Sequence, residues 1–146
     1  MTDIELIEYA SEFRRAVIGD APSAWWCAAI SAPLCAALCV IGASVQIVEN
    51  DLGECNHVFL RLSDGRILDP TADQFNLFNR VVLPGVYLGK PSAIHVGAAA
   101  YGGQCWDEFM REVKRLLPAM GADEVGGMVR MTLATLPAGL VQLPAV

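Results

Sequence analysis

The 146-residue sequence carries little charge: 18% of its residues are Asp, Glu, Lys or Arg, the net charge is -6 at pH 7, and no extended basic run occurs. Such a chain has no electrostatic footprint for nucleic acid or anionic lipid, so we expect no nucleic-acid partner. The apolar share of 54% argues against a disordered or coiled-coil chain and indicates a packed globule. Its length is that of one domain, residues 1–146.

The usual signs of a metal site are also missing. The chain has 2 histidines, His57 and His95, and no two cysteines in C-x2-C spacing. Cys55 lies close to His57 in sequence, but His95 stands alone. We therefore expect neither a zinc site nor any other cofactor.

The N-terminus lacks a basic segment followed by an apolar one, and Asp3, Glu5 and Glu8 stand there instead. This pattern predicts a cytoplasmic protein, or one delivered without an N-terminal signal peptide. The cysteine count is odd, which favours free thiols in a reducing compartment. The 5 cysteines are Cys27, Cys35, Cys39, Cys55 and Cys105.

Residues 24–48 contain no charge at all. A run of this length could span a membrane, but Pro33, Gly42 and Gln46 interrupt it and no Lys or Arg closely flanks it. We interpret it as a buried helix that ends near Gly42, followed by a strand over 44–48. A membrane partner is therefore not expected.

Helical periodicity marks residues 3–17. The apolar side chains expected near one face of this helix are Ile4, Ile7, Phe13 and Val17. The central helix should begin near residues 23–26, and Pro33 should kink it because proline removes a backbone donor. A polar loop is predicted over 49–56.

The second half of the chain gives weaker signals. Residues 72–103 are rich in turn formers, and we interpret them as a connection in preference to a substrate-facing loop. A helix is predicted over 104–117 and an edge strand within 128–136.

A β-hairpin is the clearest local pattern. Apolar and polar residues alternate over 58–63, Asp64-Gly65 forms a turn, and a second strand covers 66–68. His57 opens the first strand and Asp69 closes the second. Because the two positions lie at the same end of an antiparallel ladder, we expect their side chains to be neighbours.

Cys27 has the position of a nucleophile. It lies at the predicted start of the central helix, where a helix N-terminus and a nearby imidazolium favour a thiolate. The first N–H groups of a helix have no internal partner, so the Cys27 N–H could stabilise an oxyanion. Cys35 and Cys39 lie deeper in the same helix and are interpreted as inert core residues.

Cys27, His57 and Asp69 therefore form a candidate catalytic triad. His57 would accept the thiol proton and return it to the leaving group, and Asp69 would orient and stabilise the imidazole. Asp73 is an alternative orienting carboxylate, and Asn56 and Gln74 are weaker polar candidates.

Three segments of the sequence stand in an order and spacing known from one family. They are Cys27 with Leu34, Leu38 and Gly42, then Asn56-His57-Val58-Phe59, then Leu68-Asp69-Pro70-Thr71. This pattern, over about residues 23–75, resembles the transglutaminase-like branch of the papain-like cysteine hydrolases. The chain departs from that family at Phe59, where tryptophan is common, and at Trp26, where many relatives have a small residue.

The resemblance implies an α+β fold of the papain-like (transglutaminase-like) type, with a central helix packed on a small antiparallel sheet. It also implies hydrolysis or transfer at an amide or thioester carbonyl, and it does not identify the acyl donor. We expect a cysteine-dependent hydrolase that cleaves an amide bond of a protein or peptide through a thioester acyl-enzyme, as a peptidase, amidase or glutamine deamidase. An acyl transferase of the transglutaminase type and a non-catalytic protein-binding module are the alternatives. The sequence does not predict the oligomeric state.

Overall fold

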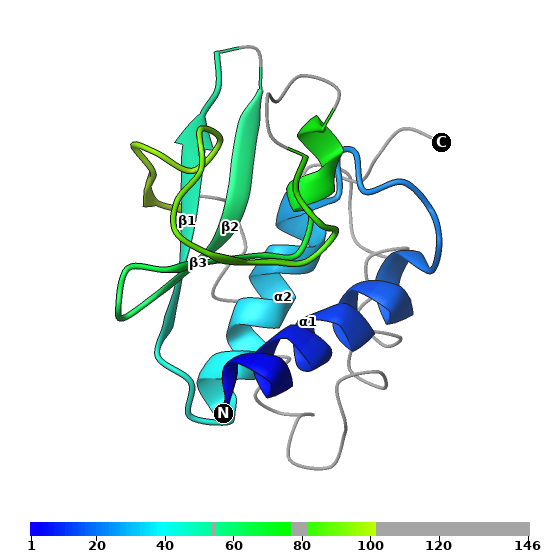
Figure 1. Ribbon diagram of the computed structural model, residues 1–146, viewed down its shortest axis with the longest axis vertical. Coiled ribbons are helices and arrows are strands. Elements are labelled where there is room, and N and C mark those ends of the chain that lie inside the picture. The colour runs from blue at the N-terminus through cyan, green and yellow to red at the C-terminus, as the bar shows by residue number, and fades with distance from the viewer. Residues whose placement is uncertain (54, 77–81, 102–146) are drawn as a thin grey trace, which may run out of the picture.

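The computed structural model describes residues 1–53, 55–76 and 82–101 (Figure 1). Two helices and five short strands make an α+β fold, as predicted. The elements are α1 (Asp3–Ile18), α2 (Cys27–Val40), β1 (Val45–Asp51), β2 (Asn56–Leu62), β3 (Ile67–Asp69), the 3-10 helix η1 (Ala72–Phe75), β4 (Tyr87–Gly89) and β5 (Ala99–Ala100). The helix predicted over 104–117 and the strand predicted within 128–136 lie outside the described residues.

The strands form one antiparallel sheet in the order β4-β3-β2-β1-β5. Its centre is the predicted hairpin, in which Leu60 pairs with Leu68 and Arg61 with Ile67. Gly65 has a φ of 88° in the turn between the strands, a conformation that favours glycine. The hairpin prediction is confirmed, including the end of β3 at Asp69.

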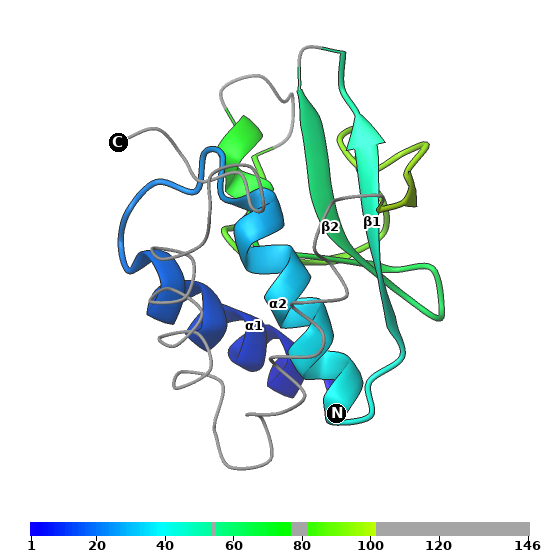
Figure 2. The ribbon, with the colours of Figure 1, turned by 180° about the vertical axis from the view of Figure 1, so that it is seen from behind.

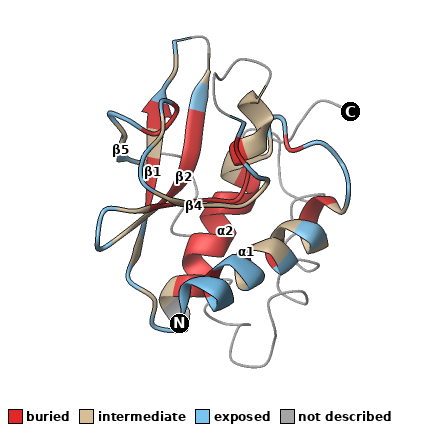
Figure 3. Cartoon of the chain, in the orientation of Figure 1, coloured by how far each residue is buried: buried red, intermediate tan, exposed pale blue. Residues whose placement is uncertain are grey.

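Both helices lie on the same side of β1 and β2, as two opposite views show (Figures 1 and 2). Alternate strand residues face the helices and enter the main core, among them Ile47, Val58, Leu60 and Leu68. The other face of the sheet packs a smaller cluster around Val48, Phe59 and Ile67. The helix α2 is the more deeply buried of the helices α1 and α2, as its largely apolar sequence predicts (Figure 3).

The helix α1 begins with a capping box. The Glu5 N–H donates to the Thr2 hydroxyl, and the Thr2 N–H donates to the Glu5 carboxylate. Its buried face differs from the predicted one, because Ile4 and Ile7 are exposed. The buried residues are Leu6, Ala10, Phe13, Val17 and Ile18.

Two further predictions need correction. The strand expected over 44–48 continues to Asp51, because β1 pairs with β2 as far as Asp51 and Asn56. The polar loop is therefore shorter than the predicted 49–56. The interpretation of residues 72–103 as a plain connection is also wrong, because this segment adds η1, β4 and β5 and carries a buried histidine.

Within the described residues, no helix has both the length and the apolar character needed to cross a bilayer. The charge-free stretch over 24–48 is instead divided between α2 and β1, with Gly42 in the turn between them. The helix continues through Pro33 to Val40.

Candidate active site

Cys27 is the first residue of α2, so the helix begins just after the predicted range of 23–26, and the Cys27 side chain is partly exposed. The turn before it is closed by a 3.0 Å bond from the Trp26 N–H to the Ser23 carbonyl. No side chain caps this helix. Among the described residues, the N–H groups of Cys27, Ala28 and Ala29 have no hydrogen-bond partner. Ala29 is buried, so the N–H groups of the partly exposed Cys27 and Ala28 are the ones that can reach a negatively charged oxygen.

Contacts one helical turn apart fix α2 against β2. The Cys27 Sγ lies 4.0 Å from the Asn56 carbonyl, and the Ser31 hydroxyl donates to the Val58 carbonyl at 3.1 Å. Four residues of helix rise about 6 Å, close to the roughly 6.6 Å that two strand residues span. The matching spacing places the Cys27 thiol beside the strand end that carries His57.

His57 and Asp69 form a buried pair. The His57 Nε2 lies 2.6 Å from the Asp69 Oδ2, and neither side chain is exposed to solvent. The register explains the contact: Asp69 continues the ladder opposite Phe59, and His57 lies two residues along β2 on the same face. The structure thus brings together the two residues that the sequence placed at one end of the hairpin.

The pair retains its charges despite its burial. Burial lowers the pKa of His57, but the charge and hydrogen bond of Asp69 and the interaction with the Cys27 thiol raise it to about 9. Burial raises the pKa of Asp69, but His57 and then His95 lower it to about 2. An imidazolium next to a carboxylate is therefore the state that this environment favours near neutral pH.

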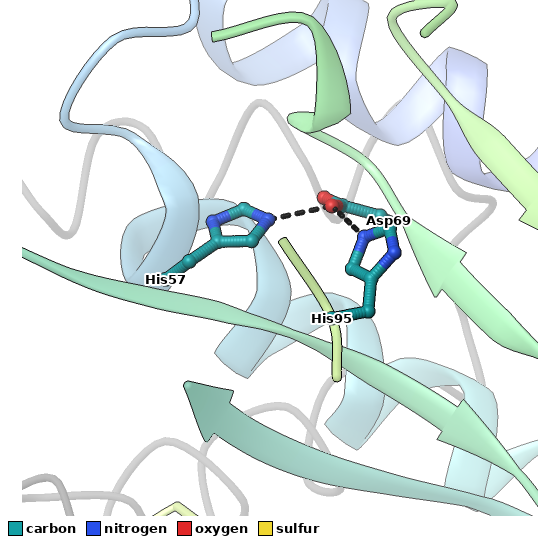
Figure 4. A group of neighbouring side chains, drawn as sticks. All are labelled: His57, Asp69 and His95. Atoms are coloured by element: carbon teal, nitrogen blue, oxygen red, sulfur yellow. Dashed lines mark hydrogen bonds and ion pairs between the residues drawn. The ribbon is translucent and has the colours of Figure 1, made fainter. Parts of the chain in front are cut away.

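His95 is the residue that the sequence analysis missed. It does not stand alone: its Nε2 lies 2.8 Å from the same Asp69 Oδ2 that binds His57, and the side chain is buried (Figure 4). It comes from the irregular segment between β4 and β5, on the opposite side of the carboxylate from His57 (Figure 4). Its only signal in the sequence is that it is one of 2 histidines.

His57, Asp69 and His95 also hold their potential ligand atoms within 4.8 Å of one another. Their hydrogen bonding fits a metal poorly. The Ser92 N–H donates to the His95 Nδ1 at 3.1 Å, so Nδ1 must carry the lone pair and Nε2 the proton. A metal at Nε2 would have to displace that proton, which Nδ1 cannot accept while it faces a donor.

Gln74 lies against the other nitrogen of His57. Its Nε2 donates to the His57 Nδ1 and to the Thr71 hydroxyl, both at 3.0 Å. A charged His57 carries a proton on Nδ1 as well, and the partner that this proton requires is the Gln74 amide oxygen, with the amide in the opposite orientation. The rings of Phe59 and Phe75 flank His57, with centroids 5.3 and 4.9 Å away.

Asp73, the alternative orienting carboxylate, has other partners. It accepts two bonds from the Arg14 guanidinium at 2.8 Å and one from the Ser23 hydroxyl at 2.6 Å. Arg14 also donates to the carbonyls of Pro70 and Gly85. This network ties α1 to the segments on either side of the site, so the role of Asp73 here is to hold those segments together.

The remaining thiols described in α2 differ from Cys27. Cys35 is buried, and burial raises the pKa of its thiol. Cys39 is half-buried and lies 3.6 Å from the Val45 carbonyl. The prediction that Cys35 is a core residue is confirmed.

Comparisons with protein-family models, with curated proteins and with solved structures gave no match for this chain.

Proposed function

We propose that the protein is a cysteine-dependent hydrolase of amide bonds with a papain-like core. Cys27 is the nucleophile, His57 the acid and base, and Asp69 the orienting carboxylate. The observation that carries the proposal is the buried 2.6 Å contact between His57 and Asp69 next to a thiol at a helix start. A buried ion pair alone is a structural feature, but the partly exposed Cys27 thiol lies beside the same strand end, 4.0 Å from the Asn56 carbonyl, and helps to raise the pKa of His57.

In the first half-reaction the Cys27 thiolate attacks the carbonyl carbon of the substrate. The negative charge moves to the carbonyl oxygen, next to the N–H groups of Cys27 and Ala28, which have no hydrogen-bond partner in the part of the chain that the structure describes. The His57 imidazolium then donates its proton to the leaving amine as the C–N bond breaks. A thioester between Cys27 and the acyl group results, and His57 is neutral.

In the second half-reaction neutral His57 takes a proton from water, and the resulting hydroxide attacks the thioester. The C–S bond breaks, the carboxylic acid leaves, and the Cys27 thiolate and His57 imidazolium are restored. Asp69 stabilises the imidazolium in both stages without itself gaining a proton, consistent with the lowering of its pKa to about 2. The expected substrate is a protein or peptide amide, including the side chain of glutamine.

The test uses p-nitrophenyl acetate, an activated acyl donor that needs no substrate-binding groups. The wild type should release p-nitrophenol in a burst, and intact-mass analysis should find one acetyl group on Cys27. Cys27→Ala and His57→Ala should lose essentially all turnover, because triad members act as a unit. Asp69→Ala should keep a measurable rate.

Cys39→Ala is the matched control, since it removes a thiol from the same helix and should leave the burst intact. Added amine reveals whether the acyl-enzyme also transfers to nitrogen, because the product then contains a new amide. Equal turnover by the wild type and Cys27→Ala would rule out the proposal.

A further inference from the structure

Asp69 is held by three N–H donors. Its Oδ2 lies 2.6 Å from the His57 Nε2 and 2.8 Å from the His95 Nε2, and its Oδ1 accepts from the Thr71 N–H at 3.0 Å. Three donors on a buried carboxylate oppose its rotation and stabilise its charge. His57 belongs to the same hairpin as Asp69 and Thr71 follows two residues after Asp69, whereas His95 comes from a distant segment (Figure 4).

The surroundings of His95 fix both its position and its tautomer. Its ring stacks on Tyr87 at 5.6 Å with an interplanar angle of 13°, and it meets the edge of Phe59 at 4.7 Å. The next residue back, Ile94, accepts a 3.0 Å bond at its carbonyl from the buried Asn50 side chain. With the Ser92 N–H on Nδ1, the imidazole can offer Asp69 only an Nε2–H donor.

We propose that His95 is a positioning residue, which holds the Asp69 carboxylate as an Nε2–H donor in the orientation that binds His57. This inference rests on the proposed function, because its effect reaches the substrate only through Asp69, His57 and Cys27. A loosened Asp69 stabilises the imidazolium less well. The imidazolium in turn stabilises less of the Cys27 thiolate.

Two substitutions separate this role from simple packing. His95→Leu removes the donor and leaves the Oδ2 atom of Asp69 one partner short. His95→Gln keeps an amide N–H near the position of Nε2. Ser92→Ala is the matched control, because it removes the Ser92 hydroxyl from Nδ1 but retains the backbone N–H that fixes the tautomer.

The measurement is the rate of Cys27 alkylation by iodoacetamide from pH 5 to 8. His95→Leu should slow labelling at pH 6 by about tenfold and move the acid limb to higher pH. His95→Gln and Ser92→Ala should stay within about threefold of the wild type. Equal rates and pH profiles for His95→Leu and the wild type would overturn the inference.

Long-range 1H–15N spectra of the wild-type imidazoles give a second readout. It does not depend on enzymatic activity, and it requires no variant. His95 should show a protonated Nε2 and an unprotonated Nδ1, and the opposite tautomer would overturn the inference. Failure of the proposed function looks different. In that case the wild type itself shows no selective labelling of Cys27, whatever the tautomer of His95.

Discussion

The Asp69 carboxylate shows how one residue can remain charged in the interior. Full burial disfavours the anion, but the His57 charge and the N–H donors outweigh this cost and lower its pKa to about 2. The same contact raises the pKa of His57 to about 9. Each residue therefore depends on the other for its protonation state.

This mutual dependence predicts how stability changes with pH. The pKa of His57 is raised from 6.5 to about 9 on folding, so its stabilising contribution is complete below pH 6.5 and is lost as pH rises through 9. The loss should be on the order of 3 kcal/mol in the free energy of unfolding. Urea titrations at pH 6 and pH 9.5 measure it.

Asp69→Asn is the control, because without the carboxylate the pH dependence in this range should largely vanish. On the acid side the direction reverses. The pKa of Asp69 is lowered from 3.8 to about 2, so its contribution is lost as pH falls through that window. A wild type as stable at pH 9.5 as at pH 6 would contradict the charged pair.

Trp25 has an unusual backbone for a bulky residue. Its φ is 71°, in the left-handed region, and its side chain is 58% exposed. Burial of the indole therefore does little to offset the strain. Trp25→Gly should be more stable than Trp25→Ala by about 1 kcal/mol, the reverse of the usual order, because only glycine relieves the strain. Thermal unfolding of both variants tests this, and a more stable alanine variant would show that the strain is absent.

At the scale of the element, the Arg14 network sets how α1 meets the site. The guanidinium binds Asp73 and the carbonyls of Pro70 and Gly85 while only 17% of its side chain is exposed. Removal of the guanidinium leaves the partly buried Asp73 carboxylate without its counter-charge, with the Ser23 hydroxyl still bound to it. Arg14→Met should therefore lower the free energy of unfolding by about 2 kcal/mol, whereas exposed Arg15→Met should change it by less than about 0.5 kcal/mol.

Gly85→Ala gives an independent test of the same network. A Cβ at Gly85 would lie 2.8 Å from the Arg14 Nη1, too close for the guanidinium to stay in place. The alanine variant should lose part of the stability that Arg14→Met loses, and the double variant should lose little more than Arg14→Met alone. If the two substitutions lower the free energy of unfolding in urea additively, the effect of Gly85→Ala does not pass through Arg14.

The hairpin and the two helices could be predicted because their sequence patterns lie within the elements themselves. The hairpin follows from alternation around Asp64-Gly65, and its register alone places His57 near Asp69. The prediction of the buried face of α1 was wrong at Ile4 and Ile7. The face of a helix that becomes buried depends on where the neighbouring helix lies. That position is a tertiary property and leaves no mark on the periodicity.

The whole molecule determines the rest of the site. His95 is 26 residues from Asp69 in sequence and follows a segment of turns, so nothing local indicates that its ring returns to the sheet. Asp73 likewise is directed away from His57 by Arg14, whose partners lie more than 50 residues away. Local sequence patterns predicted the candidate nucleophile and base, but they did not predict His95, which contacts Asp69, or the partners of Asp73.

The candidate site also joins segments that are far apart in the chain. The helix start supplies Cys27, the hairpin supplies His57 and Asp69, and the segment before β5 supplies His95. Selective reactivity of Cys27 should therefore require the intact fold. In urea above the unfolding transition, Cys27 and Cys35 should react at similar rates, whereas in the native protein Cys27 should react much faster than the buried Cys35.

Mass-spectrometric mapping of limited iodoacetamide labelling from pH 5 to 8 shows whether Cys27 is an activated nucleophile. An activated nucleophile predicts that Cys27 is modified selectively at pH 5 to 6, well ahead of Cys35 and Cys39, and that His57→Ala abolishes this selectivity. Uniform labelling, or a Cys27 that reacts only as pH approaches 8, would contradict the triad.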